Sequence, residues 1–252
     1  MFKFLKNAIE TINPPSYIVK KPKNENEVDG HIVSFVDRNS YVAEQYRVLR
    51  TSIYSLSMEK PIKTITLTSS QSGEGKTTTC CNLALTLSLD AEKKVLLIDA
   101  DLRKPELHRM LKLTRKPGFS DVLLGKMDIK ELLKKPAIGN LYVLSSGSVI
   151  SNPAELLRYK NLKKLISDMK LEFDYIIFDT PPTLNVTDSS VVGSQCDAVI
   201  MVVRAEVTQK NMIEEAHGIL KNAQAEPRGC ILTNFRVPAY MAYKYKRYYK
   251  YR

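Results

Sequence analysis

Short apolar runs and longer segments with helical spacing alternate along this chain. The runs show almost no polar alternation, which is typical of strands that are buried on both faces. They predict strands at Ile62–Thr68, Lys94–Asp99, Leu141–Leu144, Tyr175–Asp179, Ala198–Val203 and Cys230–Thr233. The segments between them predict helices at Ser40–Met58, Lys76–Leu89, Ala154–Leu171 and Lys210–Ala223. This order of elements predicts an α/β domain with a mostly parallel sheet and helices on both faces.

The composition is that of a globular chain with one core. Its 252 residues, 44% of them hydrophobic, suffice for a single sizeable domain. The longest apolar run, Ala198–Val203, has six residues, whereas a membrane-spanning helix needs about 20. Met1–Ile12 mixes charged with apolar residues and has no signal-peptide core. The cysteines have neither CxxC nor metal-ligand spacing, so we expect a reduced, cytoplasmic protein.

Positive charge is concentrated at the two ends of the chain. Of the net charge of +11, residues 1–23 carry +4 and residues 240–252 carry +5, which leaves 11 − 9 = +2 for the middle. Basic ends on a nearly neutral body suit an anionic membrane surface or an acidic partner, and they disfavour nucleic acid. We expect a flexible basic leader at 1–39, a folded domain at 40–235 and a tyrosine-rich tail at 236–252.

A phosphate-binding loop is the strongest chemical signal. Ser70–Thr77 (SQSGEGKT) follows a predicted strand and precedes a predicted helix, and it fits GxxxxGK(S/T) except that Ser70 replaces the first glycine. The glycines let N–H groups turn toward phosphate oxygens, the lysine adds a charge, and the threonine hydroxyl suits Mg²⁺. A glycine-rich turn with a surface lysine is the alternative. The expected ATP-binding residues of this P-loop NTPase-like fold are Ser72, Gly73, Glu74, Gly75, Lys76, Thr77 and Thr78.

Two predicted strands end in aspartate. The sequence VLLIDADLR places Asp99 and Asp101 at one strand end, and YIIFDTPP places Asp179 at another. Carboxyl ends of parallel strands face the crevice where ligands of open α/β sheets bind. Asp179 is the expected Mg²⁺ carboxylate, which would bind the ion either directly or through a water molecule. Asp101 either faces the same side as Asp99 or caps the following turn.

Together these motifs resemble the Walker A, A′ and B motifs of the bacterial tyrosine kinases of capsule and exopolysaccharide export. Glu44–Ile53 (EQYRVLRTSI) is similar to the ExxRxxRTNI helix through which these kinases assemble into rings. Ser146–Leu157 resembles another family segment, although Ile150 and Ser151 stand where two prolines are usual. The tyrosine cluster at the end resembles the autophosphorylation site of the family. The resemblance covers the chain from about residue 41 onward.

The resemblance implies roles for the site residues. Lys76 would act on the phosphates, and Thr77, Asp99 and Asp179 would hold Mg²⁺. Asp99 would also lie closest to the incoming tyrosine hydroxyl and would either accept its proton or orient it. Asp101 would help to fix the metal or its waters. The resemblance further implies that Asn234 contacts adenine, unless it is a turn asparagine.

Arg103 has no assigned role at this level. It either pairs with Asp101, touches phosphate or is solvated.

Oligomerisation and tail phosphorylation are further implications of the resemblance. Glu44, Arg47 and Arg50 would form the ring contact, although they also fit an ordinary charged helix face. The expected phosphorylation sites are Tyr240, Tyr243, Tyr245, Tyr248, Tyr249 and Tyr251. A tail with this composition could otherwise bind RNA, lie on a membrane or be a solvated end.

The family also implies partners: a membrane adaptor, or polysaccharide co-polymerase, that brings the kinase to the inner face of the membrane; a phosphotyrosine phosphatase; and other tyrosine-containing substrates.

Two other functions remain open from the sequence. The related partitioning and division-site ATPases carry a lysine near the start of the loop, where this chain has Gln71, and they lack the tyrosine tail. The second alternative function is a non-catalytic interaction module that is switched by nucleotide binding.

Overall fold

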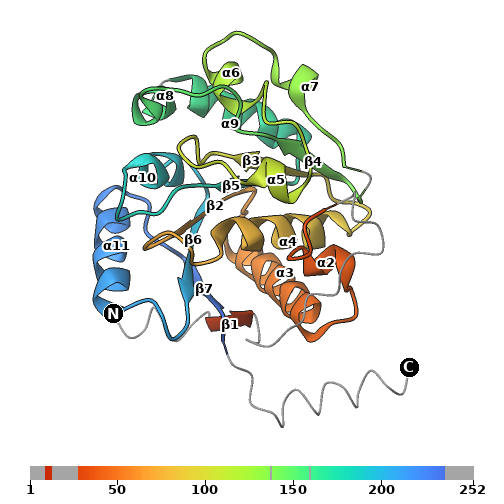
Figure 1. Ribbon diagram of the computed structural model, residues 1–252, viewed down its shortest axis with the longest axis vertical. Helices are drawn as coiled ribbons and strands as arrows, with labels where there is room; N and C mark the ends of the chain where they lie inside the picture. Colours follow the sequence, from red (N-terminus) through yellow and green to blue (C-terminus); the bar gives the residue numbers. More distant parts are fainter. Residues whose placement is uncertain (1–8, 13–27, 137, 159, 236–252) are drawn as a thin grey trace.

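A computed structural model describes residues 9–12, 28–136, 138–158 and 160–235 (Figure 1). Within these ranges, seven strands form one sheet in the order β1-β7-β6-β2-β5-β3-β4. Every neighbouring pair is parallel. The strands are β1 (Ile9–Ile12), β2 (Thr64–Ser69), β3 (Val95–Asp99), β4 (Leu141–Leu144), β5 (Tyr175–Asp179), β6 (Ala198–Arg204) and β7 (Gly229–Thr233). The predicted parallel α/β fold is therefore confirmed.

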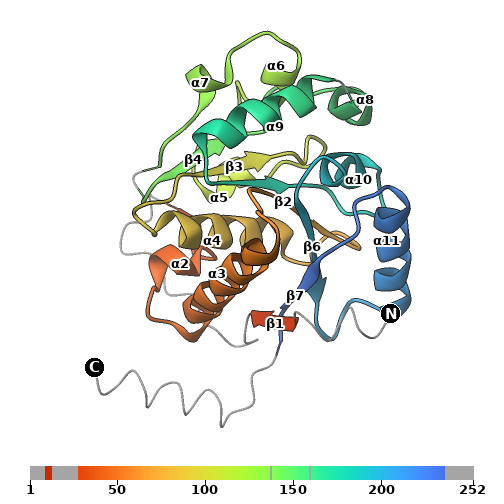
Figure 2. The same ribbon diagram turned by 180° about the vertical axis from the view of Figure 1, so that it is seen from behind.

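Helices cover both faces of this sheet, as Figures 1 and 2 show from opposite sides. One face carries α2 (Val33–Val36), α3 (Tyr41–Glu59), α4 (Lys76–Ser88) and α5 (Leu107–Met110). The other carries α6 (Phe119–Leu123), α7 (Ile129–Leu132), α8 (Pro153–Arg158), α9 (Lys160–Glu172), α10 (Asp188–Gly193) and α11 (Lys210–Asn222). The predicted helix at Ala154–Leu171 corresponds to α8 and α9. In the described part of the chain, no helix has both the length and the apolar character to cross a membrane.

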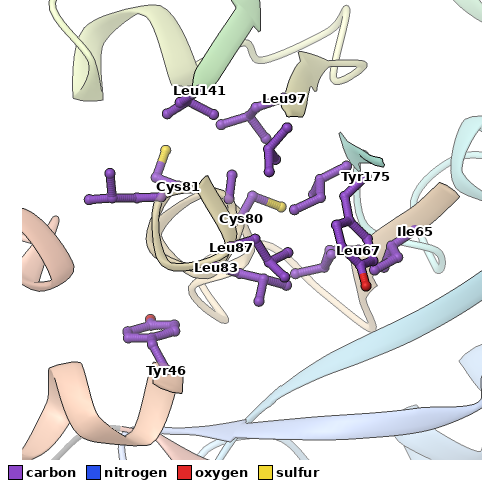
Figure 3. Close-up of a cluster of buried hydrophobic side chains, with 14 of the residues drawn as sticks. Tyr46, Ile65, Leu67, Cys80, Cys81, Leu83, Leu87, Leu97, Leu141 and Tyr175 are labelled. Carbon is purple, nitrogen blue, oxygen red and sulfur yellow. The ribbon is translucent and has the colours of Figure 1, made fainter. Parts of the chain in front are cut away.

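Helix α4 is the central element of the core. It lies between the sheet and α3, so nearly all of its residues are buried. Figure 3 shows this helix between Tyr46 of α3 and the strand residues Leu97 and Leu141. A helix that is buried all round holds its N-terminus in a fixed position relative to the strand ends. That N-terminus carries the phosphate-binding loop.

The folded part begins earlier than residue 40. Val28, Ile32 and Val33 are buried in the core beside α4, and the side chain of Asn82 on α4 accepts the Ser34 N–H at 2.9 Å. In addition, Ile9–Ile12 forms edge strand β1 beside β7. The prediction of a flexible leader is wrong for these two segments. Around residues 28–34, sparse apolar residues pack beside helix α4, which lies far along the chain, and Ile9–Ile12 pairs through its backbone with strand β7. The predicted tail lies outside the described residues.

Candidate active site at the carboxyl ends of the parallel strands

The phosphate-binding loop joins β2 to α4 in a conformation that depends on two glycines. Gly73 and Gly75 have φ values of +82° and +89°, in the left-handed region that favours glycine. Lys76 is the first residue of α4 and is 8% exposed. The 13-residue helix directs its free N–H groups and the positive end of its dipole toward this loop. The loop therefore has the backbone geometry and the charge of a phosphate site.

Glu74 plays a different part from the other loop residues. Its side chain is only 1% exposed and is turned into the protein. One carboxylate oxygen accepts the Ser70 N–H at 2.9 Å, and the other accepts the Thr208 hydroxyl. Burial raises the pKa of Glu74, while these hydrogen bonds act in the opposite direction. Glu74 thus stabilises the loop from the protein interior, and Thr208 on the connection between β6 and α11 holds Glu74 in place. We call these two residues the loop brace.

Two further side chains hold the loop backbone. The Thr233 hydroxyl at the end of β7 donates to the Glu74 carbonyl at 2.8 Å, and Arg204 Nη1 donates to the Gly73 carbonyl at 3.3 Å. Both contacts come from strand ends more than 100 residues away in sequence. Sequence reasoning missed Arg204, Thr208 and Thr233. Two of them had a positional signal, because Thr233 ends a predicted strand and Arg204 directly follows another.

Asp179 is positioned directly beside the first turn of α4. The Thr77 hydroxyl donates to Asp179 Oδ2 at 2.7 Å, and the Cys80 thiol lies 3.5 Å from Oδ1. Burial raises the pKa of Asp179 to about 6, although nearby Lys76 and the Thr77 hydrogen bond lower it. The structure brings Lys76, Thr77 and Asp179 together, as the motifs predict.

Asp99 faces the same place from the adjacent strand. Asp99 and Asp179 are register partners at the ends of β3 and β5. Asp99 is fully buried, and neither of its oxygens makes a well-formed hydrogen bond to the described residues. Burial raises its pKa well above the ordinary value, and the carboxylates of Asp179 and Asp101 add to that effect. A buried carboxylate without partners is costly unless it is protonated or meets a cation.

Asp101 and Arg103 lie in the turn that follows β3. One oxygen of Asp101 caps this turn by accepting the Lys104 N–H at 2.9 Å, which is the capping role left open above. Arg103 forms no ion pair with Asp101, and it is not simply a solvated side chain. Its Nε and Nη2 donate to the two oxygens of Asp188 on α10 at 2.9 and 3.1 Å. Sequence reasoning had no signal for Asp188 as a partner, because it lies 85 residues further on.

The residues at the α4 N-terminus fit a magnesium–nucleotide complex. A hydroxyl (Thr77) and two buried carboxylates (Asp99 and Asp179) supply the oxygen ligands that Mg²⁺ prefers. The observation that favours a cation here is Asp99, whose buried oxygens make no well-formed hydrogen bond within the part of the chain that the structure describes. Among the described residues, no three His, Cys, Asp or Glu side chains converge into a metal site of their own.

The remaining predicted residues lie elsewhere or outside the description. Asn234 follows Thr233 at the end of β7, with a positive φ of 56°. On α3, Arg47 Nε donates to Glu44 at 2.6 Å, and Arg50 Nη1 donates to the Thr86 carbonyl of α4 at 3.2 Å. These contacts are all within one chain, so the ring contact stays a prediction. The six tail tyrosines lie outside the described residues.

Comparison with known proteins gives a consistent set of relatives. A family model described as an AAA domain matches residues 62–227. The tyrosine-protein kinase YwqD of Bacillus subtilis is 35% identical over 215 residues, which are 85% of this chain and 90% of that protein. The tyrosine-protein kinase CpsD of Streptococcus pneumoniae is 38% identical over 77% of this chain and 85% of its own length. The kinase domain of the Escherichia coli tyrosine kinase ETK superposes with a TM-score of 0.84 at 26% identity and covers 91% of each chain.

These relatives favour the kinase interpretation over the partitioning ATPase. The family model, at residues 62–227, includes the loop between β2 and α4 and both strand-end carboxylates. A relative that is 35% identical over 85% of the chain establishes the family. The chain therefore belongs to the bacterial tyrosine kinases and is itself a protein-tyrosine kinase.

Proposed function

We propose that this kinase transfers the γ-phosphoryl group of ATP to tyrosines of its own C-terminal cluster, in trans within a ring. Through this reaction it regulates the synthesis and export of a capsular or extracellular polysaccharide. The observation that carries the proposal is the meeting of Asp99 and Asp179 beside the N-terminus of α4. This arrangement brings buried carboxylates to a phosphate-binding helix terminus, which suits phosphoryl transfer to a hydroxyl.

The residues of the site divide into phosphate, metal and proton roles. Lys76 and the loop N–H groups bind the phosphates, and Asn234 contacts the base. Thr77, Asp99 and Asp179 hold Mg²⁺, with Asp101 fixing its waters. When bound, the metal neutralises charge on the β- and γ-phosphates.

The transfer itself requires little covalent chemistry from the protein. The tyrosine oxygen forms a bond to the γ-phosphorus as the bond to the β–γ bridging oxygen breaks, so ADP leaves. The phenol proton passes to Asp99. A tyrosine hydroxyl has a pKa near 10, so at pH 7 it enters the reaction as a neutral phenol whose proton has to be removed.

Phosphorylation changes the charge of the tail. Residues 240–252 carry +5, and each phosphate adds about −1.5 to −2 at pH 7. About three modified tyrosines therefore cancel the charge of the tail. We expect this to loosen the ring, because the basic tail loses its attraction for the neighbouring subunit.

The proposed partners follow from the family resemblance and from the basic ends. A membrane adaptor, or polysaccharide co-polymerase, activates the kinase and holds it at the inner face of the membrane. A phosphotyrosine phosphatase reverses the reaction, and other tyrosine-containing proteins are further substrates.

The test is incubation of the full chain with ATP and Mg²⁺, with and without a peptide from the cytoplasmic end of the adaptor. Intact mass and a phosphotyrosine map are compared with Lys76→Met, with a truncation at Val237 and with Lys163→Met as an exposed control on α9. We expect several phosphates confined to Tyr240–Tyr251 in the full chain and in the control, and none in Lys76→Met or the truncation. ATP hydrolysis without any gain in mass would instead support a partitioning-type ATPase or a nucleotide-gated module.

A further inference from the structure

Arg103 and Asp188 form a two-pronged ion pair at the edge of the candidate site. Arg103 Nε lies 2.9 Å from Asp188 Oδ2, and Nη2 lies 3.1 Å from Oδ1. Two parallel hydrogen bonds fix both the distance and the orientation of the guanidinium plane. Neither residue has a part in the roles assigned above.

The two partners differ strongly in exposure. The Asp188 side chain is fully buried, whereas the Arg103 side chain is 39% exposed. A carboxylate removed from water is tolerated only when it is paired and hydrogen-bonded. Asp188 therefore acts as a fixed buried anchor, and Arg103 reaches in from the loop to meet it. This asymmetry indicates that the loop is fastened to α10 by the pair.

The pair joins the two segments that follow the strand-end carboxylates Asp99 and Asp179. Arg103 lies in the turn that Asp101 caps, immediately after Asp99. Asp188 lies in the segment that follows Asp179. The Ala100 N–H also donates to the Asp179 carbonyl at 2.8 Å. The two segments are therefore linked by a backbone hydrogen bond where they leave the strands and by the ion pair further along each segment.

The anchored segment is also tied to the base of the phosphate-binding loop. The hydroxyls of Ser189 and Thr183 lie 3.2 Å apart, and those of Thr183 and Thr68 lie 3.0 Å apart. The Thr183 N–H donates to the Ser69 carbonyl at 2.8 Å. A chain of hydrogen bonds thus runs from the residue after Asp188 to the end of β2.

We propose that Arg103 and Asp188 are a positioning pair for phosphoryl transfer. The pair holds the segment with Asp99 and Asp101 at a fixed distance from Asp179 and the phosphate-binding loop. The proton acceptor and the metal-binding carboxylates therefore keep the same positions relative to one another. This inference rests on the proposed function of the site. A displacement of about 1 Å in such a site costs on the order of 100-fold in rate.

The experiment is a double-mutant cycle on the full-length chain. Asp188→Asn keeps the shape and removes the charge. Arg103→Gln removes the guanidinium but leaves a buried carboxylate unpaired, so its folded fraction is measured by thermal unfolding. The double variant Arg103→Gln/Asp188→Asn has no unpaired charge and keeps the test valid if Arg103→Gln folds poorly. Arg103→Lys retains charge without the two-pronged geometry.

We expect kcat for phosphotyrosine formation to fall about 10- to 100-fold in Asp188→Asn, while the Kd for a fluorescent ATP analogue changes by less than about three-fold. The double variant should be no slower than the slower single variant, because both changes break the same contact. Arg103→Lys should recover part of the rate. Lys170→Gln is the matched control, because Lys170 forms a partly buried pair with Asp197 before the start of β6, away from the site (2.7 Å). It should leave kcat unchanged.

Three results overturn the inference. The first is an unchanged kcat in folded Asp188→Asn. The second is a double variant whose loss equals the product of the single losses. The third is a Kd for nucleotide that weakens as much as kcat falls in Arg103→Gln but not in Asp188→Asn, which would make Arg103 a direct phosphate ligand. A wild-type chain that hydrolyses ATP without labelling tyrosine would contradict the proposed function instead, and the same cycle is then scored on hydrolysis.

Discussion

Replacing Asp179 by asparagine should stabilise the nucleotide-free protein while it destroys activity. Asp179 is buried beside Thr77, and burial raises its pKa from 3.8 to about 6. Between these two values the folded chain keeps a proton on Asp179 that the unfolded chain has released. Stability is therefore lost as the pH rises from about 4 to 6, and it stays lost at pH 7.5. Asp179→Asn has no such loss.

The magnitude follows from the two pKa values. At about 1.4 kcal/mol per pKa unit, the ionised Asp179 costs about 1.5 kcal/mol at pH 5 and about 3 kcal/mol at pH 7.5. Asparagine keeps one acceptor oxygen and so loses one of the contacts from Thr77 and Cys80, worth about 1 kcal/mol. The net gain at pH 7.5 is about 2 kcal/mol, or roughly 4–8 °C in Tm for a chain of this size.

The assay is thermal unfolding in EDTA without nucleotide, at pH 5 and at pH 7.5. The exposed Asp168→Asn on α9 is the matched control and should not change Tm at either pH. With Mg²⁺ and ATP the order should reverse, because ligand binding stabilises the wild-type chain and not the variant. Phosphotyrosine formation by Asp179→Asn should be undetectable.

The reasoning is refuted if Asp179→Asn is less stable than the wild type at pH 7.5. It is also refuted if the difference between the two proteins does not grow from pH 5 to pH 7.5, since ionisation of Asp179 is then not its cause.

Two other predictions concern the loop brace and the ring. Thr208→Val removes the hydroxyl that donates to buried Glu74, so it should weaken binding of a fluorescent nucleotide about 5- to 10-fold and lower the free energy of unfolding by about 1–2 kcal/mol. The control is Thr51→Val at an exposed position. An unchanged Kd in Thr208→Val would contradict the role of Thr208 in supporting the loop. Arg47→Ala/Arg50→Ala should convert the ring to monomers in light scattering with a Tm loss of only a few degrees, because the Arg47–Glu44 ion pair is only partly buried and Arg50 contributes one hydrogen bond to a backbone carbonyl. Loss of folding would instead show that these arginines are needed for the fold of the domain.

The strands were predictable because their signal is local. Leu141–Leu144 and Tyr175–Asp179 have the predicted bounds. A short run of apolar residues without polar alternation is typical of a strand that is buried on both faces of a sheet. The phosphate-binding loop was predictable for the same reason, since its glycines, lysine and threonine are contiguous. Parallel strands also made it safe to expect Asp99 and Asp179 at one edge.

Contacts between distant residues could not be predicted. Asp188 meets Arg103 across 85 positions, and Thr208 meets Glu74 across 134. Each of these side chains is unremarkable in its own segment, and its role depends on which strand ends are neighbours. The packing of Val28 and Ile32 against α4 was missed because the polar residues around them dominate the local pattern.

The type of each main element and the chemistry of the phosphate-binding loop thus follow from local sequence, because hydrophobic periodicity and contiguous motifs act over a few residues. The order of the strands, with β2 between β6 and β5 and with β5 beside β3, is a property of the folded chain as a whole. A crossover connection between parallel strands does not fix which strand becomes the neighbour of which, and the packing of the helices on both faces of the sheet determines this order. It is this order that brings the β3 carboxylate to the β5 carboxylate and joins Arg103 to Asp188.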